Sequence, residues 1–160
     1  MTFTTADLYD AHEHEVQVGQ PVFHSYGGHS TFWGACATLK VFEDNSLVRQ
    51  ALEQPGQGRV LVVDGGGSLQ CALVGDLLAQ LAIDNGWAGL VVYGCIRDSV
   101  AMATMPLGIK ALQTTPRKSV KKGQGERDVT VTFAGLTIAP GNFLYSDPDG
   151  ILVAESKLGG

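Results

Sequence analysis

The sequence is short of charged and aromatic residues, and it has no long apolar run. Charged residues make up 17%, aromatic residues 8% and hydrophobic residues 44% of the 160 residues, a balance that supports a core and excludes a disordered chain. No apolar run approaches the roughly 18–20 residues that cross a bilayer, so no membrane association is expected. The first sixteen residues lack a basic region followed by an apolar stretch, so no secretory signal is expected either.

Basic residues and cysteines are also scarce. Eleven Lys and Arg against sixteen Asp and Glu leave a formal net charge of −5, whereas proteins that bind nucleic acids through phosphates usually carry a basic balance. Direct nucleic-acid binding is therefore not expected. Cys36, Cys71 and Cys95 are an odd number without metal-ligand spacing, which favours reduced, buried thiols and a cytoplasmic location.

Glycine, by contrast, is abundant at 21 residues, so the backbone must turn tightly or approach another group at many points. Two apolar runs, Val60–Val63 and Gly89–Tyr93, predict strands covered on both faces. Apolar residues at helical spacing predict a helix over Ala72–Asn85 between them. A short helix over Ser99–Met105 and a strand over Ile109–Leu112 continue this alternation, which predicts parallel pairing with right-handed crossovers.

The flanks of the chain hold shorter elements. A helix is expected over Thr5–Val16, with His12 and His14 solvated on it. A second helix is expected over Leu47–Leu52. Five further strands are expected over Val22–Tyr26, Thr31–Phe42, Val129–Phe133, Leu136–Ile138 and Gly150–Ala154. The flanking strands are expected to pair antiparallel. The sequence thus predicts one α/β domain over residues 1–160, with layers in the order β/β/α and a partly parallel central sheet.

Both buried strands end in glycine-containing loops, and ligands bind at the carboxyl ends of strands in open α/β sheets. The first loop, Asp64–Ser68, lacks both the Gly-x-x-x-x-Gly-Lys-Ser/Thr and the Gly-x-Gly-x-x-Gly patterns of nucleotide-binding loops. A tight turn is the simpler interpretation of its glycines.

The stretch Gly75–Leu78 is the sharper candidate. A helix that begins near Asp76 leaves the amides of Leu77 and Leu78 unpaired, and unpaired amides at a helix start bind carboxylates. A helix that runs without interruption from Ala72 leaves the same amides bonded. The sequence alone leaves both possibilities open.

The pair Arg97-Asp98 follows the second buried strand and lies at the same edge of the predicted sheet. The guanidinium of Arg97 can bind the same anion in a fork. Asp98 is a hard oxygen ligand suited to Mg²⁺ or Mn²⁺. From spacing alone, an ordinary surface pair is the favoured interpretation of Arg-Asp in a loop.

Five stretches of the sequence together resemble the RraA-like family, over roughly Thr5 to Ala154. They are Phe42–Asn45, Val60–Ser68, Gly94–Asp98, Pro116–Ser119 and Tyr145–Ile151. The family holds metal-dependent 4-hydroxy-4-methyl-2-oxoglutarate aldolases and regulators that bind and inhibit ribonuclease E. The resemblance implies a β/β/α swivelling-domain-like fold and a homotrimer with sites between subunits.

The aldolase branch of the family has an Asp, twenty further residues and then Arg-Asp, which Asp76, Arg97 and Asp98 match. The resemblance implies that Arg97 and the backbone of Gly75–Leu78 bind the pyruvate unit. It also implies that Asp98 ligates a divalent cation, Mg²⁺ or Mn²⁺, and that Asp76 orients a water on that metal. The sequence departs from the pattern at Ala101, where the family has an acid.

The resemblance implies cleavage of 4-hydroxy-4-methyl-2-oxoglutarate to pyruvate and decarboxylation of oxaloacetate, because both small 2-oxo acids leave the pyruvate enolate. Lys40 and Lys110 do not adjoin the motif, so a Schiff-base lysine is not expected. The alternative is a non-catalytic regulator that docks on ribonuclease E or an RNA helicase. A methyltransferase label given to some similar proteins is discounted, because the chain lacks a dinucleotide-type loop.

Overall fold

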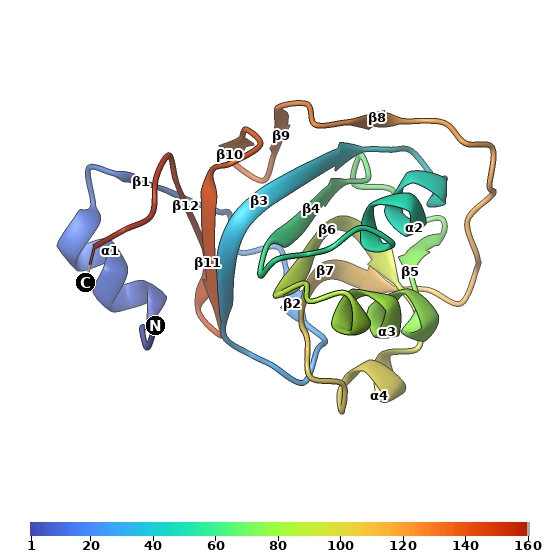
Figure 1. Ribbon diagram of the computed structural model, residues 1–160, viewed down its shortest axis with the longest axis horizontal. Coiled ribbons are helices and arrows are strands. Elements are labelled where there is room, and N and C mark those ends of the chain that lie inside the picture. Colours follow the sequence, from blue (N-terminus) through green and yellow to red (C-terminus); the bar gives the residue numbers. More distant parts are fainter. Residues whose placement is uncertain (160) are drawn as a thin grey trace.

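Four parallel strands form the centre of the fold, which a computed structural model describes over residues 1–159 (Figure 1). They are β3 (Phe32–Lys40), β4 (Val60–Asp64), β6 (Gly89–Ile96) and β7 (Gly108–Thr114), paired in that order. All five residues of β4 are buried, as expected of a strand covered on both faces. The predicted parallel centre is confirmed. Residue 160, the last of the predicted domain, lies outside the described residues.

The remaining strands surround this centre and are mostly antiparallel, as predicted. They are β1 (Val16–Val18), β2 (His24–Ser25), β5 (Ala72–Val74), β8 (Glu126–Arg127), β9 (Val131–Phe133), β10 (Leu136–Ile138), β11 (Phe143–Asp147) and β12 (Gly150–Ala154). The main sheet has the order β1-β12-β11-β3-β4-β6-β7-β2, with β5 parallel on β6 and β8 antiparallel on β3. Strands β9 and β10 form a separate hairpin.

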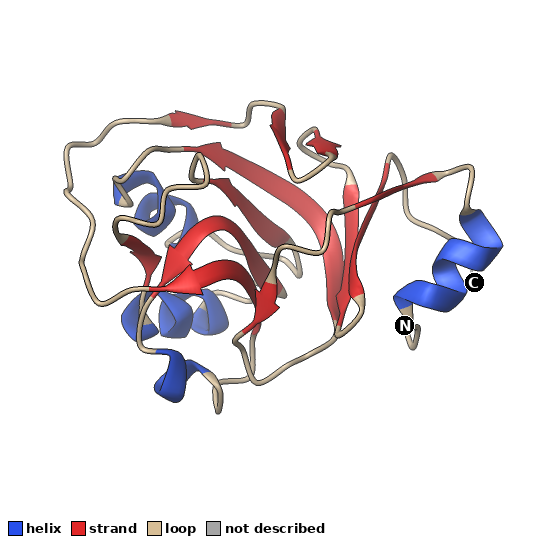
Figure 2. Cartoon of the chain, turned by 180° about the vertical axis from the view of Figure 1, so that it is seen from behind, coloured by secondary structure: helices blue, strands red, loops and turns tan. Residues whose placement is uncertain are grey.

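The helices lie in two places. Helices α2 (Ser46–Leu52), α3 (Asp76–Asp84) and α4 (Ser99–Met102) lie on one side of the sheet, and α1 (Thr5–His12) lies at the opposite end of the molecule (Figures 1 and 2). One hydrophobic core packs between the sheet and α2 and α3, and a second packs between the sheet and the β9–β10 hairpin. This confirms the β/β/α layering. No helix within residues 1–159 is long and apolar enough to cross a membrane.

The sheet curls so strongly that distant strands meet. A Cβ atom at Gly89 would lie 2.3 Å, and one at Gly108 2.0 Å, from the ring of Phe32, so only glycine lets this ring lie against β6 and β7. On β7 the buried ammonium of Lys110 donates a hydrogen bond of 2.9 Å to the carbonyl of Asp147, which belongs to β11. These contacts bring β11 close to β7, although three strands separate them in the sheet order.

The helix expected over Ala72–Asn85 is wrong in its first part. Ala72–Val74 forms the short strand β5, because Ala72 pairs with β6 and also bridges to Lys118. Gly75 keeps an extended backbone, and the helix begins only at Asp76. An apolar run of three residues fits a strand and a helix equally well, and here the pairing partner decides between them.

Other predicted boundaries also shift. The expected helix Thr5–Val16 ends at His12, because Val16–Val18 leaves it to pair with β12. His14 lies in the turn between them and is 92% exposed, as predicted. Strand β11 was not predicted, although it is the element that joins the central strands to the antiparallel flank.

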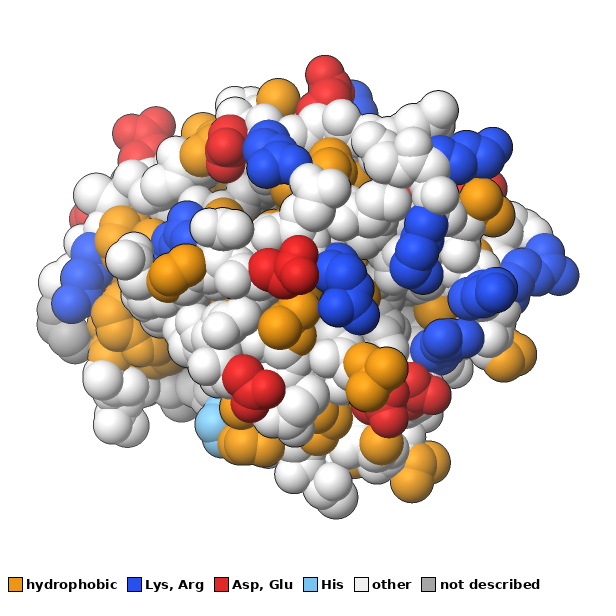
Figure 3. Space-filling model, turned by 45° about the vertical axis from the view of Figure 1, so that its right-hand side comes forward, with side chains coloured by type: hydrophobic (Ala, Val, Ile, Leu, Met, Phe, Trp, Pro, Cys, Tyr) orange, Lys and Arg blue, Asp and Glu red, His pale blue; other side chains and the backbone are white. Residues whose placement is uncertain are grey.

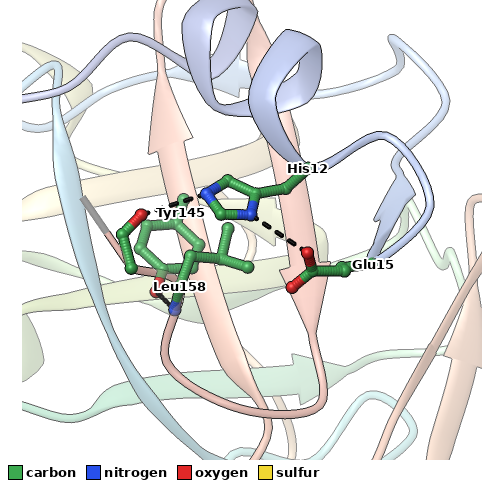
Figure 4. Close-up of polar contacts among 5 residues, drawn as sticks. His12, Glu15, Tyr145 and Leu158 are labelled. Carbon is green, nitrogen blue, oxygen red and sulfur yellow. Dashed lines mark hydrogen bonds and ion pairs between the residues drawn. The ribbon is translucent and has the colours of Figure 1, made fainter.

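The two ends of the described chain are held together beside α1 (Figure 4). His12 contacts the carboxylate of Glu15 at 3.3 Å and the carbonyl of Gly159 at 3.0 Å. The amide of Leu158 donates to the buried hydroxyl of Tyr145 at 2.8 Å. The expectation that His12 is solvated is therefore wrong, because only 17% of its side chain is exposed.

Candidate active site

Helix α3 begins in the way an anion site requires. Gly75 precedes it in an extended conformation, and Asp76 is its first residue. The amide of Asp76 donates to the Asp98 carboxylate at 3.0 Å. Within residues 1–159, the next two amides, of Leu77 and Leu78, have no hydrogen-bond acceptor. They are free to bind a carboxylate, and the helix dipole favours one there.

Asp98 is held in an unusual backbone conformation beside this helix start. Its φ of 62° and ψ of 39° lie in the left-handed region, which non-glycine residues other than Asn and Asp seldom adopt. The amide of Arg97 fixes the loop by donating to the Val74 carbonyl at 3.0 Å. A Cβ atom at Gly75 would lie 2.8 Å from Asp98 Oδ2, so glycine is needed for the close approach. Among the described residues, the guanidinium of Arg97 has a single hydrogen bond, a long one of 3.4 Å to the Pro116 carbonyl.

All six predicted site residues line one small pocket of about 150 Å³. They are Gly75, Asp76, Leu77, Leu78, Arg97 and Asp98. The pocket is smaller than the roughly 300–1,000 Å³ of sites for drug-sized ligands, and this size suits a short organic acid. Six further residues that were not predicted complete the wall: Asn45, Arg49, Ala72, Lys118, Ser119 and Lys121. The only sequence signal for some of them was their place in the stretches Phe42–Asn45 and Pro116–Ser119.

Residues 115–125, here called the basic strap, form one wall of the pocket and run along the outside of the molecule from β7 to β8 (Figure 1). The carbonyl of Arg117 accepts from the Ala72 amide at 2.8 Å. The hydroxyl of Ser119 accepts from the Asn45 amide at 3.3 Å. The strap is thus fastened to β5 and to the start of α2, which gives its lysines a defined place.

Asp44 fastens the far end of the strap. Its carboxylate is buried and accepts from the backbone amides of Lys122 and Gln124 at 2.8 and 3.1 Å. The amide and hydroxyl of Ser46 donate to its other oxygen at 2.9 and 2.6 Å. Burial alone would raise the pKa of Asp44, but these hydrogen bonds favour the charged form and lower it to about 2.

Asn45, which lines the pocket, has one unsatisfied acceptor. Its side-chain amide nitrogen donates to the Leu73 carbonyl at 3.0 Å, which fixes the orientation of the group. The carbonyl oxygen Oδ1 is buried and has no hydrogen-bond partner within the described residues. Buried polar atoms without partners are rare in folded proteins and call for an explanation.

The charged side chains of the pocket are not paired with one another. Arg49, Arg97, Lys118 and Lys121 lie around the same pocket as Asp76 and Asp98. Among residues 1–159, however, the only ion pairs within 4.0 Å are two histidine–glutamate contacts far from the pocket. Figure 3 shows Lys and Arg side chains gathered on the side of the molecule that carries α3 and the strap. Four cations against two carboxylates leave a local excess of positive charge in an acidic protein.

The donor set suits a hydrated magnesium or manganese ion. Asp98 uses Oδ2 for the Asp76 amide, and Oδ1 has no hydrogen-bond partner in the described part of the chain. Nowhere in residues 1–159 do three or more His, Cys, Asp or Glu side chains gather as a metal cage. Mg²⁺ is commonly held by one or two carboxylates together with waters and substrate oxygens. Asp98, with Asp76 beside it, fits that kind of site.

The loop Asp64–Ser68 does not belong to the pocket. The amides of Gly65 and Gly67 both donate to the Tyr93 carbonyl at 3.1 Å. The amide of Gly66 donates to the Asp64 carboxylate at 2.9 Å, and both Gly66 and Gly67 have positive φ. Because the glycine amides of the loop are hydrogen-bonded within the protein, the loop is a tight turn, as interpreted from the sequence.

Other potential nucleophiles are buried. All three cysteines are free and buried, and burial raises the pKa of Cys36 to about 12 and also raises those of Cys71 and Cys95. Burial lowers the pKa of Lys110, but its ammonium is already bonded to Asp147, and the residue does not line the pocket. The site therefore offers oxygen ligands and cations for its chemistry.

The mixed sheet, with helices on one side, defines an α/β protein. Where its parallel strands end, the free amides of α3, an arginine and an aspartate form a candidate site for small carboxylic acids. The chain belongs to the RraA-like family, whose model, described as Aldolase/RraA, matches residues 5–153.

Relatives carry more than one description. A protein of Aromatoleum aromaticum, provisionally named 4-hydroxy-4-methyl-2-oxoglutarate aldolase, is 62% identical and covers 99% of both chains. The structure of the RNA-processing inhibitor RraA from Thermus thermophilis has a TM-score of 0.96 at 47% identity, and covers 100% of this chain and 97% of that one. A Geobacillus kaustophilus structure described as S-adenosylmethionine:2-dimethylmenaquinone methyltransferase also has a TM-score of 0.96, at 51% identity, covering 98% and 97%.

Proposed function

We propose that this protein is a divalent-metal-dependent aldolase that cleaves 4-hydroxy-4-methyl-2-oxoglutarate to pyruvate and also decarboxylates oxaloacetate. One observation carries the proposal: the free amides at the start of α3, the guanidinium of Arg97 and the carboxylate of Asp98 line the same small pocket. The relatives named as aldolases of this substrate, at 62% and 60% identity, support it.

The residues of the pocket divide the work on the pyruvate unit. The amides of Leu77 and Leu78 and the guanidinium of Arg97 bind and orient its carboxylate. A divalent ion at Asp98, when bound, supplies polarisation of the 2-oxo group. Arg97 then also stabilises the negative charge that develops as the enolate forms. Because this charge arises in both reactions, the same residues serve both.

The two reactions differ in the bond that breaks and in the proton that moves. In aldol cleavage the 4-hydroxyl loses its proton, the bond between C3 and C4 breaks, and one pyruvate leaves while the other remains as its enolate. In decarboxylation of oxaloacetate, CO₂ leaves and the same enolate remains. Protonation at C3 completes both reactions. Asp76, half-buried at the first position of α3, is the carboxylate we assign to orienting the water that carries these protons.

An assay of oxaloacetate decarboxylation tests the proposal. Pyruvate formation is measured with Mg²⁺ or Mn²⁺ and then with excess chelator. We expect turnover that the chelator abolishes and that added metal restores. Absent turnover, or turnover that the chelator leaves unchanged, contradicts a metal-dependent aldolase.

A second candidate is a regulator that binds ribonuclease E or an RNA helicase without catalysis of its own. The 47% identity to the RNA-processing inhibitor RraA favours it, as does the alanine at position 101. A pull-down with the nuclease scaffold region, run beside the decarboxylase assay, separates the two. Binding without turnover supports the regulator, and turnover without binding supports the enzyme.

Two further parts of the proposal concern assembly and location. We propose a homotrimer in the cytoplasm, and exposed apolar side chains beside the pocket support a subunit contact there. Leu77 is 74% exposed and Val100 87% exposed. Sedimentation of the purified protein tests the trimer.

Methyl transfer is not proposed, despite the description of the Geobacillus kaustophilus structure. The amides of Gly65, Gly66 and Gly67, which a cofactor would need from the first loop, are bonded to the protein itself. The pocket of about 150 Å³ is also small for a nucleoside cofactor and a quinone together.

A further inference from the structure

The lining of the pocket includes cations that the reaction as described does not use. Arg49 comes from α2, and Lys118 and Lys121 come from the basic strap. None of the three forms an ion pair within 4.0 Å in residues 1–159. Unpaired cations around a pocket attract an anionic ligand and raise its local concentration.

The strap that carries the two lysines is held by many hydrogen bonds. Ser119, between them, is buried and accepts from the Asn45 amide at 3.3 Å. The Lys122 and Gln124 amides, just beyond them, donate to Asp44 at 2.8 and 3.1 Å. An ordinary surface loop does not need a buried carboxylate to fix its backbone. The hydrogen bonds therefore fix the backbone from which the two lysine side chains extend.

Both proposed substrates are dicarboxylates, whereas Arg97 and the amides of α3 account for one carboxylate only. One carboxylate of the substrate and three cations of the pocket therefore have no assigned binding partner. The small pocket places the two sets on the surface of one cavity.

We propose that Arg49, Lys118 and Lys121 bind the second carboxylate of the substrate and select 2-oxo dicarboxylates over 2-oxo monocarboxylates. This inference rests on the proposed function, because it assumes that the pyruvate unit binds at Arg97 and α3. Arg49 provides the fork for the carboxylate, and the two lysines add positive charge beside it.

Binding of two ligands that the proposed enzyme does not cleave tests the inference. 2-Oxoglutarate has both carboxylates of the aldol substrate and lacks its hydroxyl and methyl groups, whereas pyruvate has one carboxylate. Calorimetry with Mg²⁺ gives the Kd of each ligand for wild type, Arg49→Ala, Arg49→Lys and Lys121→Ala. Exchange of the pyruvate methyl protons in D₂O, followed by NMR, reports separately on the pyruvate half of the site.

We expect Arg49→Ala and Lys121→Ala each to weaken 2-oxoglutarate about tenfold, as loss of a charge-assisted contact does. Pyruvate affinity and proton exchange should stay within twofold. Arg49→Lys should recover part of the lost affinity. In Arg49→Ala and Lys121→Ala, KM for oxaloacetate should rise by a larger factor than kcat falls. The matched control is Lys122→Ala, which removes the same charge from the strap outside the pocket and should change none of these values.

Two results would overturn the inference. One is an equal loss of pyruvate and 2-oxoglutarate affinity, and the other is an equal effect of Lys122→Ala, which would show general attraction by the strap. Failure of the proposed function gives a different pattern, in which wild type neither binds pyruvate nor exchanges its protons. Melting temperatures of all variants establish that each is folded, and the exposed positions of Arg49 and Lys121 make this the expected result.

Discussion

Asp147 and Asp98 are both aspartates at the ends of strands, yet their surroundings are opposite. Asp147 is 4% exposed, and its carboxylate accepts from the amide and hydroxyl of Thr5 at 2.8 and 2.6 Å and from the Asp149 amide at 2.9 Å. Asp98 is exposed and has a left-handed backbone, and within residues 1–159 its carboxylate accepts one hydrogen bond, from the Asp76 amide. The first carboxylate is saturated and ties the fold together.

The difference shows how charge is used in this protein. Where a carboxylate is buried, as at Asp44 and Asp147, backbone and hydroxyl donors satisfy it and stabilise its charged form. Where charges surround the pocket, they are exposed or half-buried and unpaired, and so remain available to a ligand. Substitutions in the two regions should therefore separate cleanly into losses of stability and losses of activity.

The largest effect is expected for Arg97→Ala. It should lower kcat/KM for oxaloacetate by roughly 10²–10³-fold, the loss typical of a donor that stabilises transition-state charge. The melting temperature should hardly change, because the side chain has only the long contact to Pro116. Arg117→Ala, on the strap but outside the pocket, is the control. A variant within threefold of wild type would remove Arg97 from the site.

Asp147→Ala should lower stability and leave activity almost unchanged, the reverse of Arg97→Ala. Loss of a buried carboxylate that accepts from Thr5 leaves donors unsatisfied, and should lower the free energy of unfolding by about 2–4 kcal/mol. Urea denaturation measures this, and kcat/KM of the folded protein should stay within twofold. Asp149→Ala, which keeps the backbone amide that bonds Asp147, should be mild. Equal activity losses in Asp147→Ala and Arg97→Ala would contradict the division.

Acid should weaken the satisfied carboxylates. Burial raises the pKa of Asp44 and of Asp147, but the hydrogen bonds to each carboxylate have the larger effect. The net result is a lowered pKa for both, to about 2 for Asp44. Because both pKa values lie below the unfolded value of about 3.9, this stabilisation is complete above about pH 4 and is lost as the pH falls through the folded pKa. Asp44→Asn should cost about 1–3 kcal/mol at pH 7 and flatten the fall in stability between about pH 4 and 2. Parallel stability curves for the two proteins would contradict this role.

A smaller effect is expected for Gly75→Ala. The new methyl group would lie 2.8 Å from Asp98 Oδ2 and push the carboxylate aside. We expect about a tenfold lower kcat/KM, because small displacements of a positioned group are costly. The midpoint of urea unfolding should change little. Gly159→Ala, where the added methyl meets nothing within 4 Å, serves as the control, and full activity in Gly75→Ala would show that the close approach is not needed.

The smallest effect is expected at Ala101, which is exposed on α4 and does not line the pocket. Retro-aldol cleavage must deprotonate a hydroxyl, whereas decarboxylation needs no such base. Ala101→Glu should therefore raise aldol cleavage a few-fold, below the roughly 10²–10⁴-fold of a well-placed base, and leave decarboxylation unchanged. Paired kcat/KM values decide. If both reactions change alike, or if wild type already cleaves the aldol faster than it decarboxylates, that role is wrong.

The predictions from sequence succeed where local pattern and burial agree. The apolar runs that form β4 and β6 are covered on both faces, and a helix that begins after Gly75 is one of the two possibilities that the sequence leaves open. The failures depend on partners distant in sequence. Ala72–Val74 is a strand only because β6 and Lys118 pair with it.

The same limit applies to the site. Arg97 and Asp98 follow a predicted buried strand, so sequence order places them at the sheet edge where ligands bind. Asp76 follows β5, which the sequence does not predict, and only the family resemblance implies its place beside them. Lys121 lies at the pocket because Asp44 accepts from strap amides 78 and 80 residues further along the chain. The local sequence pattern does not predict a contact between residues so far apart in the chain.

Aldol cleavage by wild type and by Asp98→Asn, each titrated with Mg²⁺, tests the central claim most directly. Asparagine tolerates the left-handed backbone and can still accept from the Asp76 amide, so the fold is expected to keep its melting temperature. The proposal predicts metal-dependent release of pyruvate by wild type and a loss of at least about 10²-fold in the variant. Equal metal-dependent release by the two proteins would contradict it.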